Sequence, residues 1–175
     1  DTIRALMDHV GPLLPPVVAY EPDPHNHARL LEWSRTLPRE ILANMDFRAK
    51  AVGSAAGNVS FSGEGDAASR IDMAGTDVVP VVRLEEDLKG QDIGFLKMDL
   101  EGFEQEALLG ASCLLGGAGQ FAAVCIYHRP DDFWRIPAFM AKHFLHHQFH
   151  VRTHGQDGFD VVFYAIPALS TKEPI

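Results

Sequence analysis

The sequence predicts an α/β fold of three layers, with a mainly parallel sheet and an antiparallel strand at its C-terminal end. Short apolar runs alternate with segments of helical periodicity along most of the 175 residues. This alternation is typical of parallel strands joined by crossover helices. The last two apolar runs flank a glycine-containing turn at 155–158 and therefore predict a closing hairpin. We expect one domain over residues 1–175, because the chain shows no linker and no internal repeat.

The N-terminal half contains two predicted helices and four predicted strands. Asp23 can cap the second helix, since a carboxylate accepts hydrogen bonds from free amides at a helix start. Pro80 has no amide proton to donate. We therefore expect its strand to lie at a sheet edge, or Pro80 to lie at the start of the strand, and not within a central ladder. The helices are expected at 1–10 and 25–35, and the strands at 17–20, 46–52, 58–62 and 78–84.

The C-terminal half repeats the strand and helix alternation and ends in the hairpin. The helix at 103–115 should end at Gly116 and Gly117. Phe133 and Trp134 are expected to lie in the core or in a pocket wall. A short acidic helix should follow residue 84, with strands at 93–98, 121–127, 150–153 and 159–166 and a further helix at 131–143.

Composition excludes several kinds of partner. The formal net charge of −9 argues against nucleic acid, because proteins that bind phosphate backbones gather Lys and Arg on one face. No apolar run is long enough for a membrane span, and the N-terminus lacks the pattern of a signal peptide. We therefore expect a cytoplasmic protein whose partner is a small molecule, with assembly of identical copies left open.

Two carboxylates follow directly after the predicted strand at 93–98. Ligands of open α/β sheets bind outside the carboxyl ends of the strands, so Asp99 and Glu101 stand where chemistry is usually done. The pair could bind a ligand amine, act as a general base or chelate a divalent cation. Lys97 lies inside the strand, and we expect its ammonium group to pair with a neighbouring acid.

Other polar residues follow two more predicted strands. His128 and Arg129 come after the strand at 121–127; a histidine exchanges protons near neutral pH, and an arginine can pair with an anionic group. Glu21 ends the strand at 17–20, where an acid often accepts hydrogen bonds from ribose hydroxyls. The histidines between 143 and 154 have no acid or cysteine at ligand spacing, so we predict no metal site.

Taken together, these segments resemble the FkbM-type methyltransferases, a family of S-adenosylmethionine-dependent enzymes with the Rossmann-like class I fold. The ordered set of matching stretches covers nearly the whole chain. The stretches are residues 19–24, 50–53, 80–84 with 85–88, 97–102 with 109–111, 126–132 and 163–167.

The resemblance implies roles for particular residues. The expected cofactor is S-adenosylmethionine, and the expected reaction is O-methylation of a small molecule or a sugar hydroxyl. The catalytic residues would be Asp99, Glu101 and His128, and the cofactor-binding residues Asp1, Glu21, Pro22, Lys50, Ala51 and Asp99.

In one respect the sequence differs from the family pattern. These enzymes begin with a strand and a glycine-rich turn, whereas this chain starts with residues that resemble those after the turn. We therefore expect an N-terminally truncated domain, with the strands ending at Glu21 and Asp99 lying on either side of the additional strand. The alternatives are a Rossmann-like binding or assembly module without cofactor, and a metal-dependent phosphoryl or hydrolytic enzyme that uses Asp99 and Glu101.

Overall fold

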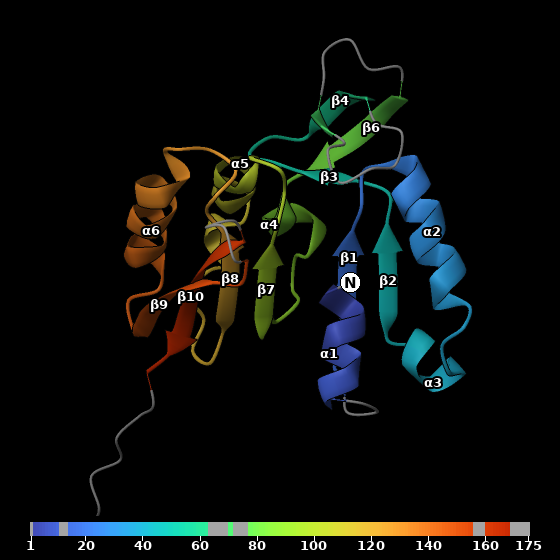
Figure 1. Cartoon of the computed structure of the whole chain (residues 1–175), viewed down its shortest axis with the longest axis horizontal. Helices are drawn as coiled ribbons and strands as arrows, with labels where there is room; N and C mark the ends of the chain where they lie inside the picture. Colours follow the sequence, from blue (N-terminus) through green and yellow to red (C-terminus); the bar gives the residue numbers. More distant parts are fainter. Residues whose placement is uncertain (1, 11–13, 63–69, 72–76, 156–159, 169–175) are drawn as a thin grey trace, which may run out of the picture. The chain divides into compact units, whose positions relative to one another are not determined.

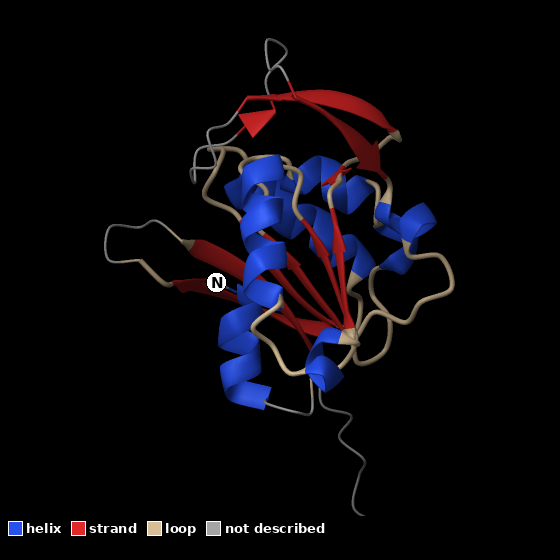
Figure 2. Ribbon diagram, turned by 90° about the vertical axis from the view of Figure 1, so that its right-hand side faces the viewer, coloured by secondary structure: helices blue, strands red, loops and turns tan. Residues whose placement is uncertain are grey.

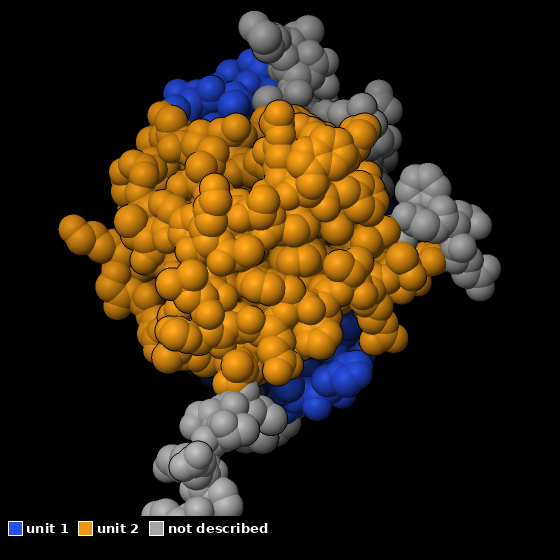
Figure 3. All heavy atoms as spheres, turned by 90° about the vertical axis from the view of Figure 1, so that its left-hand side faces the viewer, with its two compact units in different colours: residues 1–51, 57–81 blue, residues 52–56, 82–175 orange. Residues whose placement is uncertain are grey.

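Helices and strands alternate along the chain in the computed structural model, as the sequence predicts (Figures 1 and 2). The structure describes all residues except 1, 11–13, 63–69, 72–76, 156–159 and 169–175. The chain divides into two compact units, residues 1–51 with 57–81 and residues 52–56 with 82–175 (Figure 3).

The first unit contains a parallel pair of strands, a helix that precedes the pair in sequence and two helices that connect its strands. Strand β1 (Val17–Tyr20) pairs in parallel with β2 (Met45–Arg48), and the chain between them forms α2 (Pro24–Ser34) and α3 (Arg39–Leu42). Helix α1 (Thr2–Val10) precedes β1. Asp23 caps α2 as predicted, because its carboxylate accepts a 2.8 Å hydrogen bond from the Asn26 amide.

The predicted strand at 46–52 is divided between two sheets. The Lys50 amide donates to the Arg48 carbonyl at 2.9 Å, and this tight turn ends β2. Strand β3 (Ala51–Val52) then joins a four-stranded sheet of order β3-β6-β4-β5, in which β4 pairs antiparallel with β5 and β6. The other strands of this sheet are β4 (Gly57–Ser62), β5 (Arg70–Ile71) and β6 (Asp77–Val82).

The structure corrects the expected place of Pro80. Strand β6 lies between β3 and β4, so Pro80 is in an inner strand and not at an edge. Strand β3 contributes only two residues to the sheet. Because β3 is so short, not every residue of β6 needs to donate an amide hydrogen bond to it. This explains how an inner strand accommodates a proline.

The second unit contains a four-stranded sheet of order β7-β8-β10-β9. Strands β7 (Phe95–Met98) and β8 (Phe121–Cys125) are parallel, whereas β10 (Val161–Pro167) is antiparallel to both β8 and β9 (His147–Thr153). This confirms the antiparallel C-terminal strand. The β7-β8-β10-β9 sheet is mixed, and β4 pairs antiparallel with both of its neighbours, so the expected mainly parallel sheet is not confirmed. Strands β1 and β7 each lie at an edge of their own sheet in the described part of the chain.

Helices of the second unit supply buried residues to its core. Helix α4 (Leu84–Asp87) precedes β7, and the predicted helix at 103–115 is α5 (Glu104–Leu109) followed by the 3₁₀ turn η2 (Ser112–Leu114). Helix α6 (Asp132–His143) buries Asp132, Ile136 and Met140 at a spacing of four residues. Phe133 and Trp134 point away from this face and are 48% and 60% exposed, which contradicts their expected place in the core or a pocket wall.

Gly110 at the end of α5 touches another backbone segment. A Cβ atom at this position would lie 2.0 Å from the Gly53 carbonyl oxygen, although the φ angle of −73° is ordinary. We expect Gly110→Ala to lower the free energy of unfolding by about 1–3 kcal/mol, the usual range for overpacking. Denaturant unfolding measures this change. Gly94→Ala, where a Cβ would meet nothing within 4 Å, is the control, and equal effects of both variants would contradict the explanation.

Candidate active site

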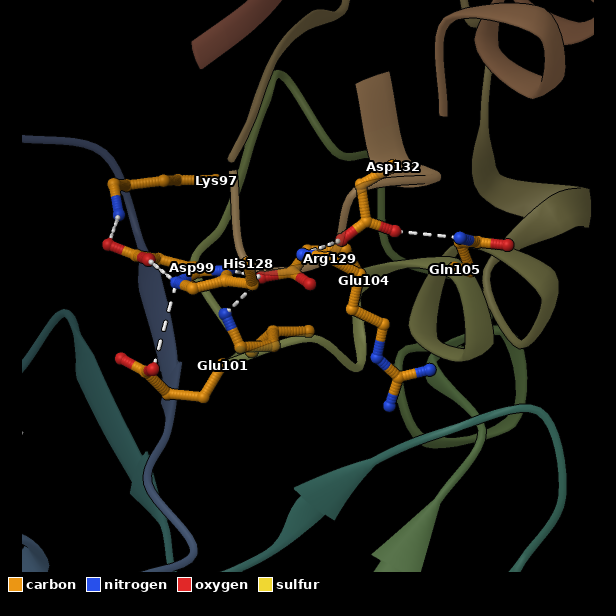
Figure 4. Close-up of polar contacts among 9 residues, drawn as sticks. Lys97, Asp99, Glu101, Glu104, Gln105, His128, Arg129 and Asp132 are labelled. Atoms are coloured by element: carbon orange, nitrogen blue, oxygen red, sulfur yellow. Dashed lines mark hydrogen bonds and ion pairs between the residues drawn. The ribbon is translucent and has the colours of Figure 1, made fainter. Parts of the chain in front are cut away.

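The predicted site residues of the second unit gather where β7 and β8 end. These strands are parallel with Met98 opposite Val124, so their carboxyl ends meet at the same edge of the sheet. Asp99 Oδ1 lies 3.5 Å from His128 Nε2, and Lys97 Nζ lies 3.0 Å from Asp99 Oδ2 (Figure 4). The expected partnership between Lys97 and a neighbouring acid is therefore confirmed.

The turn after β7 directs Glu101 toward the same histidine. Glu101 has a φ angle of 52° and Gly102 one of 95°, so two consecutive residues lie in the left-handed region. A glutamate rarely adopts this conformation, and such residues cluster at functional sites. Glu101 Oε2 lies 3.7 Å from His128 Nε2. The structure thus brings together Asp99, Glu101 and His128, the three residues predicted to be catalytic.

A fourth acid, Glu104, lies on the other side of the His128 ring. Its Oε1 accepts hydrogen bonds of 2.7 Å from the Leu100 amide and 2.7 Å from His128 Nδ1. Glu104 is fully buried at the start of α5. Sequence reasoning did not assign it a role, although it precedes Ala107 and Leu108 by three and four residues. All three are buried, so helical periodicity could have placed this acid on the inner face of α5.

Asp132 fixes the chain next to His128. It is fully buried at the start of α6, accepts from the Arg129 amide at 3.0 Å and accepts from Gln105 Nε2 at 2.7 Å. The Arg129 guanidinium stacks on the Phe103 ring, with 5.3 Å from Cζ to the ring centroid. Figure 4 shows the head of this side chain directed away from His128. The hydrogen bonds to Asp132 therefore hold together the segments that carry His128 and Glu104.

The electrostatic surroundings give the groups of the site different proton affinities. Burial by itself would lower the pKa of His128, but the Glu104 hydrogen bond and the charges of Glu104, Glu101 and Asp99 raise it above its ordinary value. Burial opposes ionisation of Asp99, yet hydrogen bonds from Lys97 and Cys125 keep its pKa below the ordinary value. At neutral pH Asp99 is thus a carboxylate, and His128 holds its proton to a higher pH than an ordinary histidine does.

Comparison with known proteins places the chain in a protein family. The family model described as the methyltransferase FkbM domain matches residues 12–151, which is most of the chain. The chain belongs to the FkbM methyltransferase domain family. A comparison with curated proteins found no significant match.

The FkbM fold is also found in a solved structure. This chain is similar to methyltransferase FkbM from Methylobacillus flagellatus KT, with a TM-score of 0.79 and 21% sequence identity. The alignment covers 94% of this chain and 40% of that one, so the chain spans well under half the length of that protein. At this identity the likeness establishes the fold alone.

The residues of this FkbM domain that were predicted to bind the cofactor lie mainly in the first unit. Glu21 follows β1 and is half-buried, its Oε1 accepts from the Asp23 amide at 3.0 Å, and burial raises its pKa. Pro22 is partly buried beside it, Lys50 follows β2 and is also partly buried, and Ala51 is 4% exposed. Asp1 lies outside the described residues. Asp99, assigned to both groups, belongs to the second unit.

One group of described residues could in principle hold a cation. Asp99, Glu104 and His128 each place a possible ligand atom within 4.8 Å of the others. Glu104 Oε1 and His128 Nδ1 are bonded to each other, so this pair of atoms is already engaged, whereas His128 Nε2 and the Asp99 carboxylate face each other at 3.5 Å. The C-terminal histidines have other partners: His143 bonds the Phe139 carbonyl, His147 the Gln120 carbonyl and His154 the Tyr164 hydroxyl.

None of the helices in the described ranges is long and apolar enough to cross a membrane.

Proposed function

We propose that this FkbM domain transfers a methyl group from S-adenosylmethionine to a hydroxyl oxygen of a small molecule. The observation that carries the proposal is the convergence of Asp99, Glu101 and His128 at the adjoining ends of β7 and β8, in a chain of a methyltransferase family. A histidine whose Nε2 lies 3.5 Å and 3.7 Å from two carboxylates is suited to binding a hydroxyl and removing its proton. The three-layer Rossmann-like arrangement of the sheets is part of the same proposal.

The residues of the first unit fit the sugar of the proposed cofactor. Ribose hydroxyls are recognised by a carboxylate with two acceptor oxygens at the end of a parallel strand. Glu21 stands at the end of β1, which is parallel to β2, and its hydrogen bond with the Asp23 amide engages a single oxygen, Oε1. In this proposal Glu21 binds the ribose hydroxyls and Asp99 lies beside the methyl-donor group. The residues next to the adenine are Pro22, Lys50 and Ala51.

In the proposed reaction the protein forms no covalent bond with the substrate or the cofactor. Bound S-adenosylmethionine supplies a methyl group activated by a positively charged sulfur. The acceptor oxygen forms its bond to the methyl carbon as the sulfur–carbon bond breaks, the sulfur keeps the bonding electron pair, and the hydroxyl proton leaves to a protein base. The residues at the end of β7 and β8 therefore orient the acceptor oxygen and receive its proton.

The cofactor assignment is tested by calorimetry with S-adenosylhomocysteine on the native full-length protein. We expect Glu21→Gln to weaken binding by about 1–3 kcal/mol, because charge-assisted hydrogen bonds to the ribose are lost. Glu32→Gln is the matched control, since Glu32 is an exposed acid of the same unit. Equal affinities of both variants would reject the ribose role of Glu21. No binding to the native protein would reject the proposed function and favour a binding or assembly module.

A further inference from the structure

Both nitrogens of the His128 ring have defined surroundings. Nδ1 is bonded to Glu104 Oε1 at 2.7 Å, whereas Nε2 has no hydrogen-bond partner among the described residues and lies 3.5 Å from Asp99 and 3.7 Å from Glu101. The His128 side chain is only 7% exposed. A carboxylate can only accept, so in the neutral ring the shared proton must reside on Nδ1. The lone pair then lies on Nε2, on the side of the ring that faces the two partly exposed acids.

The Glu104 carboxylate is held in place independently of the histidine. The Leu100 amide donates to the same Oε1, and Glu104 Oε2 is buried without a hydrogen-bond partner in the described part of the chain. The charge of this buried carboxylate is therefore balanced mainly by the Leu100 amide and the His128 ring. Burying a carboxylate is costly unless a partner compensates it, which suggests a role for Glu104 beyond packing.

Two other ionisable groups near His128, the Cys125 thiol and the Tyr127 hydroxyl, do not act as bases near neutral pH because they are already protonated. Burial and the charge of Asp99 raise the pKa of the Cys125 thiol to about 12, and they also raise that of the Tyr127 hydroxyl. These two groups from β8 therefore keep their protons. Lys97 from β7 is paired with Asp99, whose own pKa is low. Glu101 and Glu104 are the remaining acids that face His128, and Glu104 is already bonded to the ring.

We propose that Glu104 is a positioning residue that fixes neutral His128 as the Nδ1-protonated tautomer, so that Nε2 receives the hydroxyl proton of the methyl acceptor. This inference rests on the proposed methyl transfer and names its base. The proton moves from the acceptor oxygen to Nε2 as the oxygen–carbon bond forms and the sulfur–carbon bond breaks. The Glu104 carboxylate keeps its hydrogen bond with Nδ1 and stabilises the imidazolium ring that results.

The tautomer is measured on the native full-length protein without any acceptor, by ¹⁵N NMR of the histidine rings. His128→Asn, which removes the ring, identifies the His128 resonances. Above the titration midpoint of His128 we expect a protonated Nδ1 and an unprotonated Nε2. A neutral ring protonated at Nε2 would overturn the proposal. Line broadening of these resonances at stoichiometric Mn²⁺ would also overturn it, because the site would then hold a cation.

Glu104→Gln tests the charge without removing the hydrogen-bond acceptor. The glutamine oxygen can still accept from the Leu100 amide and from His128 Nδ1, so we expect the fold and the tautomer to persist. Because the negative charge is gone, the titration midpoint of His128 should fall. Glu106→Gln is the control on the same helix, since Glu106 is exposed, and it should leave the midpoint unchanged. Equal midpoints in the native protein and Glu104→Gln would overturn the proposal.

The kinetic readout separates a positioning role from a structural one. In native protein, kcat/KM should rise with pH through a midpoint above the ordinary value for histidine, since the deprotonated ring is the active base. Glu104→Gln should move this rise to lower pH and reduce the plateau at least about tenfold. An unmoved profile would overturn the proposal. Retained S-adenosylhomocysteine binding in that case would show that only this inference fails and the proposed function stands.

Discussion

Replacing His128 by asparagine is expected to lower the rate of methyl transfer by about 10²–10⁴-fold, the usual contribution of a general base. The asparagine amide nitrogen can take the place of Nδ1 and donate to Glu104 Oε1, which His128 contacts at 2.7 Å. The variant therefore keeps the internal hydrogen bond and loses the outer part of the ring, which carries Nε2. Single-turnover rates at saturating S-adenosylmethionine measure the effect, because they are independent of product release.

Two controls show whether this loss is chemical. His150→Asn replaces an exposed histidine of β9 and should leave the rate unchanged. Thermal unfolding of His128→Asn should stay close to that of the native protein, because the Glu104 partner is retained. If rate and stability fall together in His128→Asn, or if the rate is unchanged, His128 does not act as the base.

The largest effect on stability is expected from Gly116→Ala. Gly116 has a φ angle of 80°, and a Cβ atom there would lie 2.0 Å from the His143 carbonyl oxygen at the end of α6. The left-handed conformation costs an alanine about 1 kcal/mol, and overpacking against a backbone atom adds about 1–3 kcal/mol. We therefore expect the free energy of unfolding to fall by about 2–4 kcal/mol, measured by denaturant unfolding.

Gly119→Ala separates the two contributions. Gly119 has a φ angle of 86°, but a Cβ atom there would meet nothing within 4 Å. This variant should therefore show the conformational cost alone, about 1 kcal/mol. A loss in Gly116→Ala no greater than the loss in Gly119→Ala would show that the contact with α6 does not limit this position.

Local patterns were sufficient to predict most elements of the fold. Periodicity and capping placed α2 and its Asp23 cap, and the terminal apolar runs gave the antiparallel pair β9 and β10. These features depend on residues close in sequence. The convergence of Asp99 and His128 was also predictable, because residues after neighbouring parallel strands share one sheet edge.

Features set by distant contacts were not predictable in the same way. The inner position of β6 depends on how β3 and β4 pair around it, which Pro80 alone does not reveal. The exposure of Phe133 and Trp134 follows from the face of α6 that packs inward. Glu104 was not singled out from the sequence because an acid at a helix start usually lies in solvent, whereas here it is buried and bonded to His128.

The most direct test of the account is methyl transfer by the native full-length protein in the presence of S-adenosylmethionine with a deuterated methyl group. The protein is incubated with fractionated small-molecule extracts, and products are identified by mass spectrometry. We predict a small molecule that carries the labelled methyl group on oxygen, formed faster as pH rises through the His128 midpoint and lost in His128→Asn. A labelled product that His128→Asn forms equally fast, or no labelled product although the protein binds S-adenosylhomocysteine, would contradict the account.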